Sequence, residues 1–226
     1  MKTTVLRSAA TAAAALLLLA SCGETAPGVA ADIDGDRITD EQVDAFAEVL
    51  CAIGGVSGGE AGTPTRSARF ASLQILMANE LTRDIADVES VSPEQVSTIL
   101  QGMAPAREGL SEGQLETFDE VAREFARSQT AIVELGRQSL EEAGQQGEIT
   151  DDVAYAEGQR LLTEHAEQAD IAVDPRFGEV VDGALQPGSG SLSVPVSELA
   201  VQGSAAEAGD RLASLLPASQ KCESPS

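Results

Sequence analysis

The sequence predicts a mostly α-helical, bundle-like domain, in which a small N-terminal hairpin pairs with a strand near the C-terminus. Ala, Glu, Gln, Leu and Arg recur through the middle of the 226-residue chain, a composition that favours helices. The chain has no Trp, one Tyr and five Phe, so we expect a core of Ala, Leu and Val side chains. The length suits one domain, with room for a small appendage.

The predicted hairpin lies at residues 29–38. Residues 29–33 alternate in polarity like a short strand, residues 34–36 (Asp-Gly-Asp) are typical of a tight turn, and Arg37-Ile38 begins the returning strand. Thr39 then caps a helix, because Gln42 lies three residues further on and completes a capping box. The order is therefore strand, turn, strand, helix.

Four more helices are expected from apolar residues at helical spacing and from capping signals at their starts. Their expected positions are about 65–88, about 93–104 after Ser92-Pro93, about 112–143 after Ser111 with Gln114, and from 151 after Thr150.

The character of the sequence changes after the fifth helix. Residues 171–174 alternate in polarity like a strand, and residues 175–178 are typical of a turn. We expect the helical domain to span residues 29–181. Residues 182–226 form a Gly-, Pro- and Ser-rich C-terminal extension, with a short extended segment at 192–201 and a weak helix at 204–216.

Residues 1–21 have the pattern of a secretory signal. A basic start and an apolar run end in Leu19-Ala20-Ser21, followed by Cys22. This pattern resembles a bacterial lipobox, which implies that Cys22 is diacylated and becomes the first mature residue. We therefore expect residues 22–28 to tether the protein to the extracytoplasmic face of a cell membrane. The alternative is an ordinary secreted protein whose Cys22 merely lies near the cleavage site.

The net charge of the chain is −23 at pH 7. Removing residues 1–21 takes away two basic residues and no acid, so the mature charge would be 12 − 37 = −25. Such a surface repels phosphate backbones and anionic lipid head groups, so nucleic acid is not an expected partner. Attachment to the membrane would depend on the two acyl chains of one cysteine.

Two cysteines remain after Cys22, namely Cys51 and Cys222. In an oxidising compartment an even remainder of two favours one disulfide, and the alternative is two unpaired thiols. Neither cysteine lies in a Cys-x-x-Cys motif, so a reactive thiol catalyst is not expected.

No motif predicts a cofactor or a metal. The acidic run from Asp32 to Asp36 begins like a calcium loop, but Arg37 stands where such a loop needs Gly, and Val43 where it needs Glu. His165, the only histidine, shares an apolar face with two leucines and is expected to be a packed, hydrogen-bonded residue. One histidine gives little basis for a catalytic triad or a zinc site.

Two segments resemble parts of the SurA-type chaperone family, which includes parvulin-linked foldases. Residues 29–39, followed by an amphipathic helix, resemble the opening of that family's helical domain. Residues 171–178 (Ile-Ala-Val-Asp-Pro-Arg-Phe-Gly) resemble the strand that closes it. Residues 192–197 also resemble the tails of actinobacterial lipoproteins that carry this domain. The resemblance covers residues 29–178 in layout, and its two ends are the parts that resemble a motif.

The resemblance implies an apolar groove between helices that holds extended, unfolded segments. The expected function is that of an envelope lipoprotein with chaperone or holdase character, which acts on unfolded or secreted polypeptides without nucleotide or metal. The groove would be lined by spare apolar side chains, for which the candidates are Phe70, Met77, Phe118 and Phe125, each of which fits an ordinary core equally well. No isomerase domain follows the helices, so prolyl isomerisation is the less favoured alternative. A lipoprotein that scaffolds one cell-envelope complex is the other alternative.

Overall fold

The computed structural model describes residues 25–54, 64–145, 147–187 and 216–222. The signal segment and Cys22 lie outside the described residues, and so do residues 192–201 and nearly all of the helix expected at 204–216. No helix in the part of the chain that the structure describes has the length and apolar character needed to cross a membrane.

The predicted N-terminal hairpin is confirmed. Strand β1 (Val29–Ile33) pairs antiparallel with β2 (Asp36–Thr39). Asp34 and Gly35 between them both have positive φ, 51° and 101°, as a two-residue turn of this twist requires.

The strand predicted near residue 171 closes the same sheet. Strand β3 (Ile171–Val173) pairs antiparallel with β1, with Ala31 opposite Val173 and Ile33 opposite Ile171. The sheet order is therefore β2-β1-β3, and the N-terminal hairpin joins a segment about 140 residues further along the chain.

Five α-helices make up most of the described chain, so the mostly helical fold class is confirmed. They are α1 (Asp40–Ala52), α2 (Thr65–Ile85), α3 (Pro93–Met103), α4 (Glu112–Glu142) and α5 (Asp151–Ala166). The capping boxes of Thr39 with Gln42 and of Ser111 with Gln114 are both present. Because those caps fix the entry of α1 and α4, the sequence places both helix starts correctly.

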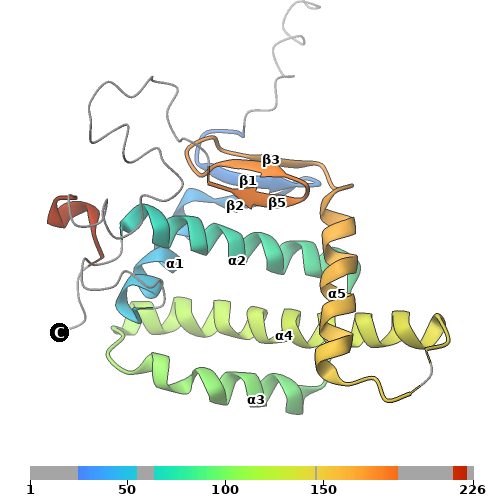
Figure 1. The fold of residues 1–226 in the computed structure, drawn as a ribbon. Coiled ribbons are helices and arrows are strands. Elements are labelled where there is room, and N and C mark those ends of the chain that lie inside the picture. The colour runs from blue at the N-terminus through green and yellow to red at the C-terminus, as the bar shows by residue number, and fades with distance from the viewer. Residues whose placement is uncertain (1–24, 55–63, 146, 188–215, 223–226) are drawn as a thin grey trace, which may run out of the picture.

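The helices form layers beside the sheet (Figure 1). The β2-β1-β3 sheet lies along one side of α2, α4 runs beside the other side of α2, and α3 packs on the far side of α4. Helix α5 crosses α2 and α4 and returns the chain to the sheet.

The core has two buried clusters. One lies between the sheet, α2 and α5 and includes Ile33, Leu73 and Leu162. The other lies between α1 and α4 and includes Phe46 and Val49. As expected, aliphatic side chains supply most of both clusters.

A second hairpin that the sequence analysis missed follows β3. Strands β4 (Glu179–Val181) and β5 (Ala184–Gln186) pair antiparallel, and Leu185 joins the core cluster against the sheet. The domain boundary expected between residues 181 and 182 was therefore wrong, because it falls inside this hairpin.

The described C-terminal segment, residues 216–222, returns to the start of α2. Lys221 forms an isolated antiparallel bridge with Pro64, after a short 3₁₀ turn at Ala218–Gln220. Cys222 and Cys51 of α1 are joined in a disulfide, with Cα atoms 5.1 Å apart. This crosslink closes a loop with a sequence separation of 171 residues.

Candidate functional site

The structure does not arrange the four apolar candidates as an open groove. Met77 belongs to the core cluster under the sheet and Phe118 to the cluster against α1, each with only 4% of its surface exposed. Their expected place in a client groove was wrong, because both side chains fill the protein's own core. Phe70 is half-buried and packs against the sheet-side cluster. Phe125 is half-buried and belongs to neither cluster.

A cleft of about 500 Å³ opens instead at the junction of β2, α1, α2 and α4. Its apolar floor includes Ile38, Leu76 and Val121. Its charged lining comprises five acids and two arginines: Asp36, Glu41, Glu80, Glu120, Glu124, Arg37 and Arg83. The charged lining of the cleft is therefore mainly acidic, and apolar side chains also contribute to the lining.

Arg83 of α2 connects two sides of this cleft. Its guanidinium donates to Glu80 at 2.6 Å and to Glu124 of α4 at 3.3 Å. Burial raises the pKa of Glu80 above its ordinary value, although Arg83 partly offsets that effect. Partial desolvation makes ionisation of the Glu80 carboxyl less favourable than in open solvent.

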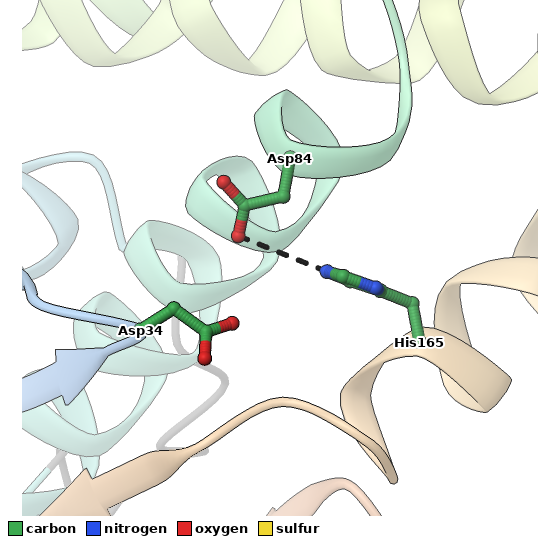
Figure 2. A group of neighbouring side chains, drawn as sticks. All are labelled: Asp34, Asp84 and His165. Atoms are coloured by element: carbon green, nitrogen blue, oxygen red, sulfur yellow. Dashed lines mark ion pairs between the residues drawn. The ribbon is translucent and has the colours of Figure 1, made fainter.

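Beside the cleft, three polar side chains from distant parts of the chain converge (Figure 2). Asp34 comes from the β1–β2 turn, Asp84 from the last turn of α2 and His165 from the last turn of α5. One ligand atom from each lies within 4.8 Å of those from the other two. His165 Nε2 is 3.7 Å from Asp84 Oδ2.

The turn that carries Asp34 is fixed to Asp170, the residue directly before β3. The backbone N–H of Asp34 donates to Asp170 O at 3.0 Å, and the N–H of Asp170 donates back to Asp34 Oδ1 at 3.1 Å. This reciprocal pair orients the Asp34 carboxylate toward His165 and Asp84 (Figure 2). The order of the sheet thus determines the position of one member of the group.

His165 is half-buried, and its Nε2 atom is buried without a hydrogen-bond partner. The expectation of a packed residue holds, but the hydrogen bond expected of it is absent at Nε2. A 3.7 Å separation is too long for a hydrogen bond to Asp84. The sequence does not predict this group, because its members lie at positions 34, 84 and 165 with no spacing signature.

A second acidic group adjoins the first and shares Asp84. Asp36 of β2 and Glu80 of α2 place carboxylate oxygens within 4.8 Å of each other and of Asp84. Because Asp36 and Glu80 also line the cleft, polar side chains run continuously from His165 to the cleft. This surface suits the binding of cationic groups.

No family model, curated protein or solved structure matches this chain.

Proposed function

We propose that this protein is a membrane-anchored extracytoplasmic lipoprotein whose helical domain binds unfolded or secreted polypeptide segments as a holdase. The observation that carries the proposal is the pairing of β1 with β3. These strands are the two segments that resemble the opening and the close of a SurA-type domain. The resemblance implies a domain in which these two strands pair and the helices lie between them in the sequence.

The cleft is the proposed binding site, rather than a groove lined by Phe70, Met77, Phe118 and Phe125. A volume of about 500 Å³ lies within the range of ligand-binding clefts and accommodates a few residues of an extended chain. Its apolar floor would take aliphatic side chains, and its five acids favour segments that carry Lys or Arg. Clients are therefore expected to be apolar segments flanked by basic residues.

The proposed anchor would hold this cleft near the membrane. Six residues separate Cys22 from Val29, where β1 begins, so the tether reaches at most about 20 Å. The β2 wall of the cleft pairs directly with β1. A secreted chain that emerges from the membrane would then be within reach of the cleft.

The proposal is tested with residues 22–226 carrying Cys22→Ser, which prevents acylation. Light scattering follows the aggregation of several unrelated unfolded proteins, with the holdase at near-stoichiometric amounts. We expect the protein with an unchanged cleft to suppress aggregation of these clients, most strongly for basic clients. The double variant Glu41→Lys/Glu120→Lys should lose most of that protection, because it reverses two charges of the cleft lining.

The matched control is Glu108→Lys/Glu142→Lys. It makes the same change in net charge at two exposed positions outside the cleft lining and should retain protection. Equal losses in both double variants would contradict binding in the cleft. No protection of any client by the parent protein would contradict the holdase function and favour a scaffold for one envelope complex. Faster proline-limited refolding without protection would favour an isomerase.

A further inference from the structure

We propose that Asp34, Asp84 and His165 bind one divalent transition-metal ion, with Zn²⁺ as the favoured metal. His165 Nε2 is buried and has no hydrogen-bond partner. Buried polar atoms are almost always paired, so an unpaired one needs an explanation. An imidazole nitrogen that faces two carboxylates has the arrangement of a metal ligand.

The spacing of the ligand atoms fits a metal better than a direct hydrogen bond. Zinc ligands lie about 2.1 Å from the ion, so two ligands of one tetrahedron are separated by about 3.4 Å. The 3.7 Å between His165 Nε2 and Asp84 Oδ2 is close to that edge length. The two distances from Asp34 to these ligands are at most 4.8 Å, which exceeds that edge length by at most about 1.4 Å.

Three fixed elements hold the ligands. Asp84 and His165 each lie in the last turn of an α-helix, and the Asp170 amide holds one oxygen of Asp34. That hydrogen bond leaves Oδ2 of Asp34 for the ion and orients the ligand, as hydrogen bonds to coordinating carboxylates commonly do. The β1–β2 turn, α2 and α5 would then be joined at one point.

The donor set determines the class of metal. One imidazole nitrogen and two carboxylate oxygens suit Zn²⁺ and related transition ions, whereas Ca²⁺ and Mg²⁺ prefer ligands that are all oxygen. The side chains of Asp84 and His165 are 29% and 28% exposed, so a water molecule can reach the fourth position. The neighbouring group of Asp36, Glu80 and Asp84 offers oxygen ligands only. A substitution in that group therefore serves as the control for zinc binding at His165.

The single histidine makes the test direct. ZnCl₂ is titrated into residues 22–226 carrying Cys22→Ser, prepared without a histidine tag, while imidazole ¹⁵N resonances are recorded. We expect the Nε2 resonance to move to a coordinated position with 1:1 stoichiometry. Calorimetry should give a dissociation constant in the micromolar range or below for Zn²⁺ and at least tenfold weaker binding for Ca²⁺.

Variants identify the ligands. Asp34→Asn keeps the oxygen that accepts from Asp170, and both it and His165→Gln should weaken zinc binding at least tenfold while their circular dichroism spectra stay unchanged. Asp36→Asn, the matched control, should bind zinc within a factor of two of the parent. The proposal would be overturned if equimolar zinc left the imidazole ¹⁵N chemical shifts unchanged. It would also be overturned if the His165→Gln variant bound zinc with the affinity of the parent. Zinc binding is read independently of client protection, so either result can fail without the other.

Discussion

Gly136 of α4 and Gly158 of α5 face each other where the two helices cross with their backbones in contact. A Cβ atom placed on Gly136 would lie 2.6 Å from the backbone nitrogen of Gly158, and one on Gly158 would lie 2.7 Å from Ile132 Cγ2. Near this crossing, Ser139 of α4 donates to Glu157 of α5 at 2.8 Å. Hydrogen bonds from Arg160 and Ser139 lower the pKa of Glu157 to about 2. The crossing sets the course of α5 toward His165 and β3.

Replacement of either glycine by alanine should destabilise the fold. In Gly158→Ala the new methyl group meets α4 backbone atoms that cannot rotate away, so the helices must separate, and we expect a loss of about 3 kcal/mol or more. Denaturant unfolding followed by circular dichroism measures the loss. Gly102→Ala in α3 is the control, because its Cβ meets nothing within 4 Å, and it should stabilise by about 0.5–1 kcal/mol. Equal effects of the two substitutions would contradict the close crossing.

Asp174 should stabilise the protein in a pH-dependent way. Arg176 donates to Asp174 at 2.7 Å and to Asp40 of α1 at 2.8 Å, which ties the segment after β3 to α1. The hydrogen bonds from Arg176 lower the pKa of Asp174. A carboxyl whose folded pKa is depressed stabilises above its unfolded pKa, about 3.9, and loses that contribution as the pH falls through the folded pKa.

The Asp174→Asn variant should therefore be less stable than the parent at pH 7, by about 1 kcal/mol, with a difference that shrinks below about pH 4. Unfolding free energies between pH 3 and pH 7 measure it. Glu108→Gln, an exposed change of equal charge, is the control. A difference between Asp174→Asn and the parent that stays constant across this range would contradict the ion pair.

Glu80 should show the opposite pH dependence. Burial raises its pKa, and a carboxyl with a raised folded pKa stabilises fully below its unfolded value, about 4.3, and loses that contribution as the pH rises through the folded pKa. Glu80→Gln removes the ionised form. We expect its stability relative to the parent to increase between pH 4 and pH 7, measured in EDTA so that no metal contributes. A gain that instead decreases toward pH 7 would show that the Arg83 contact outweighs burial.

The Cys51–Cys222 bond should contribute to the free energy of unfolding. In the chain-entropy model a loop of 171 residues gives about 5 kcal/mol, an upper bound that strain in the folded state reduces. The double variant Cys51→Ser/Cys222→Ser should unfold at lower denaturant, and the reduced parent should match it. Identical midpoints for oxidised and reduced parent would contradict a stabilising crosslink. Peptide mapping without reductant checks the pairing itself.

The elements that the sequence predicts well are those with local chemical signals. A helix start is predicted at each of three N-cap residues, Thr39, Ser92 and Ser111. Such residues are favoured there because their side-chain oxygen can accept a hydrogen bond from an amide that the first turn leaves unpaired. The Asp34-Gly35 turn is equally local. Polarity alternation at 171–174 also identified β3.

Features that depend on tertiary contacts could not be predicted from the sequence. Leu185 pairs and packs in a three-residue strand that lies between Gly183 and Pro187, residue types that predict a loop. Met77 and Phe118 lie on apolar faces, and periodicity cannot distinguish a face that lines a groove from one that fills a core. The meeting of Asp34 with His165 depends on the β1–β3 register and on the Gly136–Gly158 crossing, which join segments far apart in the chain.

The central claim is that the cleft receives polypeptide clients at the membrane, and crosslinking in intact cells tests it most directly. A photoreactive amino acid is placed at Gln42 in the cleft of the full-length, acylation-competent chain, and at exposed Glu142 in a control. We expect several unrelated secreted proteins to be trapped from position 42, few from position 142, and loss of the trapped clients when Cys22→Ser removes the anchor. One envelope protein trapped in fixed ratio from position 42, or the same products from both positions, would contradict the holdase account.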